Sequence, residues 1–571
     1  MKRRINPVVV VCMLIAAVTL IGIVTTLIMR RIPTRKQMDL TEYYGQTDDS
    51  EAVIIVGTQI LEQKAVMSGE QPYLPVDVVD SYLNQRYYWD EEGQQILYAT
   101  PSELIYTPAS AEAGGDVWLK DGTAYLSLDF IKRYTDLDTY VYQQPNRIAI
   151  QKDFSGVSVV TATKDTYVRY RGGIKSEVLS RVNKGDNLIL MEELENWDQV
   201  ATWDGYIGYI EKSSVSDVQN LNMDRKAVGE SYTYLTMDQP VNLVWHQVMS
   251  TDANAGLSEA IQNMTGVNVI SPTWFYVTDN NGNIINNATA DYVSLAHEKG
   301  LKVWGLVDNF TQDISTYEVL SRTSSRQNLV SQLVNAAVGA GIDGINVDFE
   351  QLSEDVGVHF LEFLRELSIE CHKNNLVLSV DNPVPEDFTS HYDRAEQGKV
   401  VDYVIIMGYD EHYVGSEEAG SVASLPWVEK GIQDTIAEVP AQRVINAVPF
   451  YTRLWKTEAG SLSSEAIGMD TAQEVVNTNN AQVYWDSDVS QNYGSFEKDG
   501  CTYQIWIEDS QSIAAKVQLV HFLLPRLKKY RNNRLEDNEN EETIIFIDIY
   551  PYVNFSTDQT ESQWGLAVQT I

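Results

Sequence analysis

One run of ten residues, Gly341-Ile-Asp-Gly-Ile-Asn-Val-Asp-Phe-Glu350, constrains the fold more than any other stretch. Its last six residues alternate between apolar and polar, which is typical of a β-strand with two unlike faces. The faces hold Ile345, Val347 and Phe349, and Asn346, Asp348 and Glu350. Crowded carboxylates repel one another and lose hydration, which raises the pKa of one of them. The run therefore predicts a strand that presents a proton donor near neutral pH.

This run resembles the signature of glycoside hydrolase family 18, Asp-x-x-Asp-x-Asp-x-Glu, beginning at Asp343. Asn346 stands where most members carry an aspartate. The resemblance implies that Glu350 is the acid and base, and that Asp348 orients the acetamido group of the substrate, which is the nucleophile. We expect Asn346 to hydrogen-bond Asp348 without sharing a proton, which affects the pH profile more than the activity.

The chain from Pro240 onward alternates apolar runs with helical patterns, as parallel βα units do. Candidate strands begin at Val241, Val267, Lys302, Gly344, Leu376, Tyr403 and Val444. Seven such strands predict an α/β fold, a (β/α)₈ TIM barrel over residues 239–571. Its eighth strand is either Ile544–Ile549 or the run near Trp564.

Further motifs follow the ends of these strands, where barrel enzymes carry their chemistry. Met407-Gly-Tyr-Asp410 resembles the Met-x-Tyr-Asp motif of the family, which implies that Tyr409 contacts the acetamido group and that Met407 and Asp410 line the sugar subsite. The run from Val448 to Trp455 resembles another family motif, so Tyr451 and Trp455 are expected to contact sugar.

Weaker resemblances to the spore-cortex and peptidoglycan-active branch of the family add further candidates. The candidate substrate-binding residues are Asp343, Met407, Asp410, Tyr451, Trp455, Trp274, Asn309 and Glu508. Glu350, Asp348, Asn346 and Tyr409 are the candidate catalytic residues.

The N-terminal segment, residues 1–36, predicts a membrane anchor. The uncharged run of residues 7–29 is long enough to cross a bilayer as one helix, and no clear cleavage site follows. Basic residues flank it on both sides, so charge alone does not set its orientation. A cleaved export signal is the alternative, and it would leave the remaining chain on the same side of the membrane.

Two small modules separate this segment from the barrel. Residues 51–152 resemble the copper-amine-oxidase N-terminal-like α+β domain, but no histidine precedes His246, so we expect no metal there. Residues 156–216 resemble the bacterial SH3-like domain, with short strands and Gly-marked turns that fit a small β-barrel. Residues 217–238 are predicted to be a linker.

Charge and cysteine content exclude other classes of function. The chain has 571 residues and a formal net charge of −38, which argues against nucleic acid as a partner because phosphate binding needs clustered Lys and Arg. The three cysteines, Cys12, Cys371 and Cys501, are too few for a disulfide framework. The scattered histidines predict no metal site, and no cofactor is expected.

Together these features predict a cell-membrane glycosidase, single-pass, with its catalytic region outside the cell. Its substrate would be a polysaccharide that contains N-acetylglucosamine, peptidoglycan or chitin-like. Two alternatives stay open: a family barrel that binds glycan without cleaving it, and a structural envelope protein with a relic barrel. Retention of Glu350 favours the enzyme over the binding protein.

Overall fold

The computed structural model describes residues 7–45, 48–223, 225, 228–229, 231–262, 264–523 and 565–568. The chain divides into two compact units. The first comprises Met1–Trp89, Gln94–Tyr98 and Tyr106–Gly229, and the second comprises Asp90–Gly93, Ala99–Ile105 and Glu230–Ile571.

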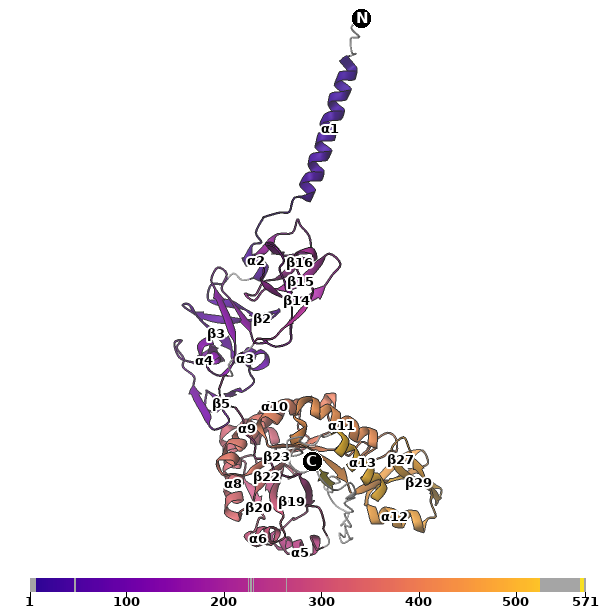
Figure 1. Cartoon of the computed structure of the whole chain (residues 1–571). Coiled ribbons are helices and arrows are strands. Elements are labelled where there is room, and N and C mark those ends of the chain that lie inside the picture. The colour runs from indigo at the N-terminus through magenta and orange to yellow at the C-terminus, as the bar shows by residue number, and fades with distance from the viewer. Residues whose placement is uncertain are drawn as a thin grey trace, which may run out of the picture. The chain divides into compact units, whose positions relative to one another are not determined.

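The first unit begins with α1 (Pro7–Arg31), a single long helix (Figure 1). Its residues from Val8 to Arg31 are apolar and long enough to cross a membrane, and none of the 18-residue window is buried against protein. Such a helix suits lipid rather than a protein core, and an export signal has the same features. The short helix α2 (Leu40–Tyr44) follows, with Asp39 as its N-cap.

The first β-sheet of this unit carries two copies of one local design. Strand β3 runs directly into helix α3, and β8 into α4; the two strands pair antiparallel. Its described strands, in spatial order, are β7 (Val117–Lys120), β8 (Thr123–Ser127), β3 (Gln71–Pro75), β2 (Gln59–Ser68), β1 (Glu51–Val56), β10 (Arg147–Gln151) and β9 (Asp138–Tyr142). The helices are α3 (Val76–Tyr82) and α4 (Leu128–Tyr134), and a small separate sheet holds β4 (Tyr87–Asp90), β5 (Gln95–Ala99) and β6 (Leu104–Pro108).

The second β-sheet is antiparallel, and several of its neighbouring strands follow one another in the sequence. Its described strands, in spatial order, are β13 (Val178–Val182), β12 (Thr166–Arg169), β16 (Ile207–Glu211), β15 (Trp197–Ala201), β14 (Asn187–Glu193), β11 (Val157–Thr161) and β17 (Gln219–Leu221). Strand β17 pairs with β11, so the segment predicted to be a linker begins as part of this sheet. Gly208 lies too close to the backbone of Arg169 for any side chain, which fixes glycine at this crossing.

The segment after α1 packs on this second sheet rather than hanging free. Gln37 forms a parallel bridge with Val178, the edge residue of β13. Met38 is buried in the core of the same sheet, and the Tyr43 hydroxyl donates a hydrogen bond to the carbonyl of Ile207 at 2.7 Å. The predicted boundary at residue 36 therefore falls within a segment that packs on this sheet.

The second unit is built on a curled parallel sheet, consistent with a TIM-like fold. Its described parallel strands, in spatial order, are β18 (Asn242–His246), β19 (Val269–Val277), β21 (Lys302–Asp308), β22 (Gly344–Asp348), β23 (Val377–Pro383), β24 (Tyr403–Met407) and β25 (Val444–Pro449). These are the seven strands that the sequence predicts. Their Val- and Ile-rich runs are buried on both faces, as a parallel sheet requires.

The last strand of the ring differs from the prediction. β31 (Gly565–Val568) lies between β18 and β25, but it pairs antiparallel with both. A (β/α)₈ barrel would have a parallel strand here. Of the two predicted candidates, the run near Trp564 adjoins β31, whereas Ile544–Ile549 lies outside the described residues.

Helices pack outside the parallel strands: α8 packs on β22, α9 on β23 and α10 on β24 (Figure 1). The described helices are α5 (Leu257–Ala260), α6 (Ala290–Glu298), α7 (Thr316–Ser321), α8 (Thr323–Ala340), α9 (Gly357–Lys373), α10 (Arg394–Val400), α11 (Leu425–Glu438) and α13 (Ser510–Leu523). Helix α8 ends at Gly341, whose φ of 75° gives the left-handed turn that leads into β22. The chain before β18 also packs here, since Arg443 lies over the ring of Tyr234, so residues 231–238 are not a free linker.

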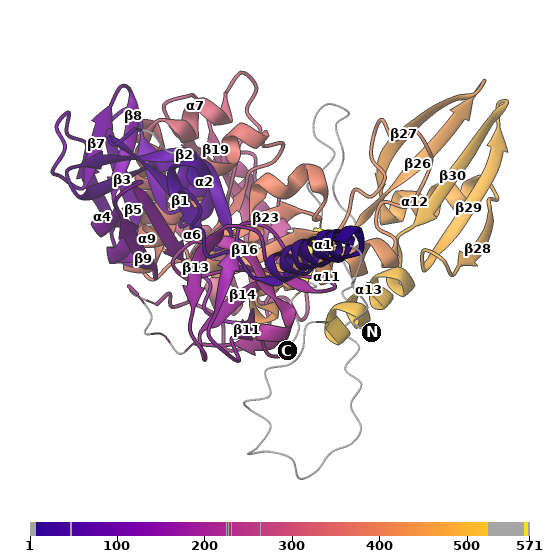
Figure 2. The same ribbon diagram turned by 90° about the horizontal axis from the view of Figure 1, so that it is seen from above.

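A second sheet is inserted between β25 and α13, and the sequence did not predict it. Its described strands, in spatial order, are β27 (Ser461–Gly468), β26 (Tyr451–Glu458), β30 (Cys501–Ile507), β29 (Gln491–Lys498) and β28 (Gln482–Asp486). Helix α12 (Met469–Thr478) covers one face of it through Ala472 and Val476. We call residues 451–507 the insertion sheet, which stands apart from the curled sheet as a separate layer (Figure 2).

Candidate active site

Four carboxyl groups gather at the carboxyl ends of three neighbouring strands. Asp308 ends β21 and Asp348 ends β22, and the two residues are direct partners in the parallel register. Glu350 follows two residues after Asp348, and Asp381 lies on β23. Asp308, Asp348 and Asp381 are 0, 7 and 1% exposed. This is the end of a parallel barrel at which enzymes carry their chemistry.

Burial, together with repulsion between neighbouring carboxyls, raises the pKa of three of these four groups. Burial, followed by the nearby carboxyls of Glu350 and Asp381, raises the pKa of Asp348 well above its usual value. Burial also raises the pKa of Asp381, which the hydrogen bond from Asn346 partly offsets. The pKa of Asp308 rises to about 7, mainly through burial. The cluster therefore holds protons to a higher pH than free carboxyls do.

Asp308→Asn is expected to stabilise the protein at pH 8 more than at pH 5. A carboxyl whose pKa is raised in the folded state stabilises the fold fully below its unfolded pKa of about 4, and that contribution is lost as the pH rises to about 7. The free energy of unfolding falls by at most about 4 kcal/mol over this pH range, and an amide at position 308 would avoid this fall. Thermal unfolding at both pH values measures the effect, with the exposed Asp387→Asn as the control. An equal change in melting temperature at the two pH values would contradict the raised pKa of Asp308.

Asn346 joins four strands, and its partners differ from the expectation. Its Oδ1 accepts hydrogen bonds from Trp245 Nε1 at 2.9 Å and from the Ser271 hydroxyl at 3.2 Å. Its Nδ2 donates to Asp381 Oδ1 at 2.9 Å. The expected hydrogen bond to Asp348 is replaced by this bond to Asp381, because the Asn346 side chain turns across the sheet toward β23.

Asn346→Asp is expected to keep activity within about tenfold and to move the alkaline limb of the pH–kcat profile to higher pH. The new carboxyl would face Asp381 and would have to share a proton with it. The added negative charge raises the pKa of neighbouring acids, so the proton donor stays protonated to higher pH. A profile that coincides with that of the wild type would contradict this account of the cluster.

Asn309, predicted to bind substrate, instead holds the backbone of Glu350. Its Oδ1 accepts from the Glu350 N–H at 3.0 Å, and its Nδ2 donates to the Glu350 carbonyl at 3.0 Å. Phe349 is buried between Phe360 and Phe363, with ring centroids 5.9 and 5.5 Å away. These contacts fix the loop that carries Glu350, so Asn309 positions the acid.

Tyr409, Asp410 and Tyr451 lie beside the carboxyl cluster. The Tyr451 hydroxyl donates a hydrogen bond to Asp410 Oδ1, and the rings of Tyr409 and Tyr451 meet edge to face at 6.2 Å. Burial and the carboxyl of Asp348 raise the pKa of Tyr409, which therefore keeps its proton and can donate a hydrogen bond. Met407, half-buried at the end of β24, lies two residues before it.

Asp343 lies at the opposite end of the sheet from the carboxyl cluster. It precedes β22, whereas Asp348 ends that strand, so five residues of strand, about 16 Å, separate them. Its carboxylate pairs with His297 at 2.7 Å and Lys302 at 2.7 Å. The prediction that Asp343 binds substrate is therefore wrong for this structure, since Asp343 ties the strand to its neighbours.

Two tryptophans predicted to contact sugar are enclosed by protein. Trp274 is 0% exposed, and its Nε1 donates to Asn254 Oδ1 at 2.9 Å. Trp455 is 1% exposed, and its Nε1 donates to the carbonyl of Gly420 at 2.9 Å. Neither ring has a face open to a ligand in this structure. Trp455 joins the insertion sheet to the loop after β24.

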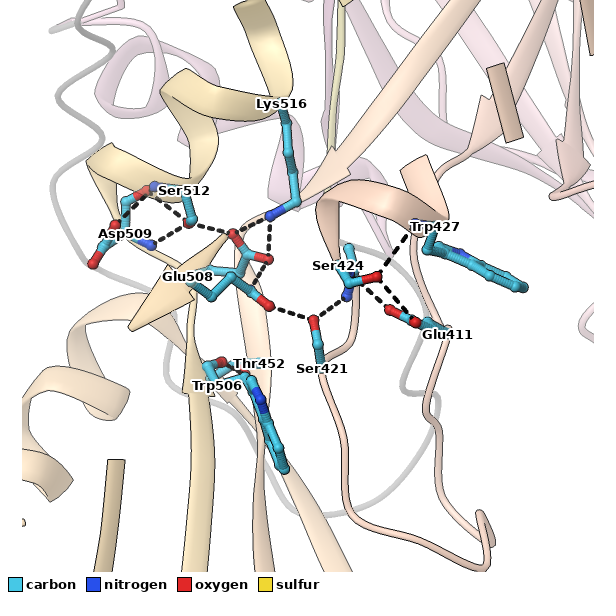
Figure 3. A network of polar contacts seen from close by, with 12 residues as sticks. Glu411, Ser421, Ser424, Trp427, Thr452, Trp506, Glu508, Asp509, Ser512 and Lys516 are labelled. Atoms are coloured by element: carbon cyan, nitrogen blue, oxygen red, sulfur yellow. Dashed lines mark hydrogen bonds and ion pairs between the residues drawn. The ribbon is translucent and has the colours of Figure 1, made fainter. Parts of the chain in front are cut away.

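Glu508, also predicted to bind substrate, is the centre of a buried polar network (Figure 3). Its carboxylate accepts hydrogen bonds from Lys516 at 2.8 Å, Ser512 at 2.6 Å and Gln491 at 2.6 Å. Gln491 in turn accepts from the Ser421 hydroxyl, on the loop after β24. With its oxygens occupied, Glu508 joins the insertion sheet, α13 and this loop, which is a structural role.

Glu508→Gln is expected to lower the free energy of unfolding by about 3 kcal/mol or more, because it leaves Lys516 charged and buried without a carboxylate. The double variant Glu508→Gln/Lys516→Met should recover part of this loss, since it removes the unpaired charge. Chemical denaturation measures both variants. Equal instability of the single and double variants would show that the ion pair is not the cause.

Asp308 and Asp381 are site residues to which the sequence assigned no role. Each is a single aspartate in an otherwise apolar strand, Lys302-Val-Trp-Gly-Leu-Val-Asp308 or Val377-Leu-Ser-Val-Asp381. A carboxyl inside a buried strand needs a reason, and that signal could have identified both. Within the described ranges, no three His, Cys, Asp or Glu side chains are grouped to hold a metal ion.

Comparisons with known proteins identify a family for the second unit of the chain. The profile described as Glycosyl hydrolases family 18 matches residues 231–522, just over half of the chain. The uncharacterized glycosylase YvbX of Bacillus subtilis is 24% identical over 282 residues, 47% of this chain and 81% of that protein. The B. subtilis glycosylase YdhD is 31% identical over 211 residues, and the B. subtilis cortical fragment-lytic enzyme is 22% identical over 253.

The matched region is only part of some relatives. The YdhD match covers 36% of this chain and 50% of YdhD, and the match to the cortical fragment-lytic enzyme covers 42% of this chain and 58% of that enzyme. Among solved structures, that of B. subtilis YdhD is 28% identical, with a TM-score of 0.42, over 44% of this chain and 85% of that one. The Bacillus cereus spore cortex-lytic enzyme SleL is 19% identical, with a TM-score of 0.44, over 54% and 71%. On the profile match to residues 231–522, the chain belongs to glycoside hydrolase family 18.

Proposed function

We propose that this protein is a glycosidase that hydrolyses β-1,4 bonds next to N-acetylglucosamine, with catalytic assistance from the substrate's own acetamido group. The observation that carries the proposal is the cluster of Asp348 and Glu350 with Asp308 and Asp381 at the carboxyl ends of β21 to β23. Tyr409 adds a protonated hydroxyl beside them. Glycosidases commonly use neighbouring carboxyl groups with shifted pKa values to break a glycosidic bond.

In the proposed reaction, Glu350 donates its proton to the glycosidic oxygen as the bond from that oxygen to C1 breaks. The acetamido oxygen attacks C1 and forms an oxazolinium ion, whose N–H is held by Asp348. Asp348 Oδ1 has no hydrogen bond to any described residue, so it can accept that N–H. Glu350 then takes a proton from water as the water oxygen attacks C1. This attack opens the oxazolinium ring, restores the acetamido group and leaves the configuration at C1 unchanged overall.

Exposed apolar side chains around the site support a polymeric glycan as the substrate. On loops and helices that follow the parallel strands, Met249, Tyr317, Phe388 and Tyr413 are 60, 44, 79 and 56% exposed. Isolated apolar residues need no explanation, but several on segments that follow the parallel strands, the end that carries the carboxyls, suit the flat faces of sugar rings.

The second candidate is a protein of the same fold that binds glycan without cleaving it. Glu350, and the Asn309 amide that holds its backbone, favour the enzyme. Incubation of the full chain with purified peptidoglycan and with chitin oligomers tests both, with Glu350→Gln as the matched blank. Release of reducing ends by the wild type alone supports the hydrolase. Binding with no release by either protein would favour the binding protein.

We also propose that α1 anchors the chain in the cell membrane, with the residues after it outside the cell, where the glycan is. The two β-sheets of the first unit would then be an amine-oxidase-like spacer and an SH3-like module that places the enzyme near the cell wall. The long apolar helix supports the anchor. A reporter fused after Lys36 should be active only outside the cytoplasm. Reporter activity confined to the cytoplasm would show that the residues after α1 lie inside the cell and would contradict the proposal.

A further inference from the structure

The segment that follows α1 is fixed to the second sheet of the first unit by a set of hydrogen bonds. The N–H of Thr34 donates to the carbonyl of Ile174 at 2.8 Å, and the N–H of Val178 donates to the carbonyl of Lys36 at 2.8 Å. Arg169 Nη1 donates to the carbonyl of Thr34 at 3.1 Å. This part of the chain therefore pairs with the edge of β13 and is not a free tether.

The loop of residues 170–176 lies directly at the end of α1. Lys175 Nζ donates to the carbonyl of Met29, in the last turn of the helix, and to that of Ile32 at 2.7 Å. A lysine at this place satisfies free carbonyls and complements the helix dipole. The same loop carries Arg171, which lies over the ring of the exposed Tyr170.

These contacts place basic side chains from two distant parts of the sequence together. We define the basic collar as Arg30, Arg31, Arg35, Arg171 and Lys175. All five are exposed, and none forms an ion pair with a carboxylate in the described part of the chain. The chain as a whole has 80 acidic residues against 42 basic ones, so a cluster without acidic partners is unusual for it.

The depth of the basic collar follows from the length of α1. Its 25 residues span about 37 Å, slightly more than the hydrocarbon core of about 30 Å, so Arg30 and Arg31 fall at the level of the lipid headgroups. Three residues later, at most about 11 Å along the chain, Thr34 is already bonded to the second sheet. The 170–176 loop must therefore lie at the membrane surface whenever α1 spans it.

We propose that the basic collar binds the headgroups of anionic phospholipids and holds the second sheet against the membrane. Lys and Arg side chains near an anionic membrane surface are attracted to it, and Tyr170 suits the same interfacial layer. The proposal rests on the proposed anchoring by α1. It goes beyond anchoring because it assigns lipid recognition to Arg171 and Lys175, about 140 residues after the helix.

The test reconstitutes the full chain into nanodiscs of equal phosphatidylcholine and phosphatidylglycerol and measures, by native mass spectrometry, which lipids stay bound. The wild type should retain phosphatidylglycerol in excess. Arg171→Glu/Lys175→Glu should lower the ratio of the two retained lipids at least about fivefold, and Arg171→Lys/Lys175→Arg should preserve it. Arg171→Glu alone, which leaves the Lys175 contacts to α1 intact, should lower the ratio in part.

The matched control is Arg181→Glu/Lys184→Glu, which changes the net charge equally on β13 and in the turn after it, away from the α1 contacts. It should retain the wild-type ratio. If both double variants lower the ratio equally, or neither does, the basic collar is not a lipid site. If the chain does not enter nanodiscs at all, the proposed anchoring by α1 is wrong, and the lipid site that depends on it is wrong as well.

Discussion

Changing Glu350 to glutamine is expected to lower turnover on peptidoglycan or chitin oligomers at least about a hundredfold, while glycan binding stays nearly unchanged. Glutamine keeps the shape of the side chain but has no proton to donate. The Asn309 hydrogen bonds go to the backbone of residue 350, so the substitution leaves that loop held in place. Single-turnover hydrolysis and binding of the same oligomer, measured side by side, separate the loss of chemistry from a loss of affinity.

Glu354→Gln is the control for this experiment, because it makes the same chemical change four residues later on an exposed site. It should leave both turnover and binding unchanged. Full activity of Glu350→Gln would remove the hydrolase proposal and leave the glycan-binding protein as the better account. A loss of binding equal to the loss of turnover would mean that the substitution had disturbed the site rather than the chemistry.

The parallel strands could be predicted because each is a short apolar run that is buried on both faces, as in Val404-Ile-Ile406. The insertion sheet could not be predicted in this way. Its strands mix polar with apolar residues, and Gln482–Asp486 is almost entirely exposed, so they give no continuous apolar signal. The antiparallel direction of β31 is also invisible to a pattern argument, because apolar periodicity does not encode the sense of a strand.

The candidate site was predicted where one strand supplies the residues, and missed where several strands do. Alternation along β22 places Asp348 and Glu350 together, but it says nothing of Asp308 and Asp381 on the neighbouring strands. A motif also does not show at which end of the strand each of its residues lies, so Asp343 was grouped with residues about 16 Å away. Conversely, an aromatic or acidic residue near a motif can be structural, as the buried Glu508 is.

Asp348→Asn is expected to lower turnover at least about a hundredfold, for a reason different from that of Glu350→Gln. Its carboxyl oxygen Oδ1 has no hydrogen bond to a described residue and is the acceptor proposed for the acetamido N–H. An amide can still accept that bond, but it carries no charge to stabilise the oxazolinium ion, and losing one such group costs about 10²–10³ in kcat. A thiazoline mimic of the cyclised sugar should accordingly bind Asp348→Asn much more weakly than the wild type.

The double variant Asp348→Asn/Asn346→Asp decides whether the position of this charge matters or only its presence. It restores the number of carboxyls on β22 but moves one of them two residues back. Because the side chain at 346 contacts Trp245, Ser271 and Asp381, the relocated carboxyl would face β23 rather than the acetamido group. Turnover should therefore stay as low as in Asp348→Asn, with the thiazoline affinity equally reduced. Recovery to within about tenfold of the wild type would show that the cluster acts through its total charge, and Asp348 would lose its specific role.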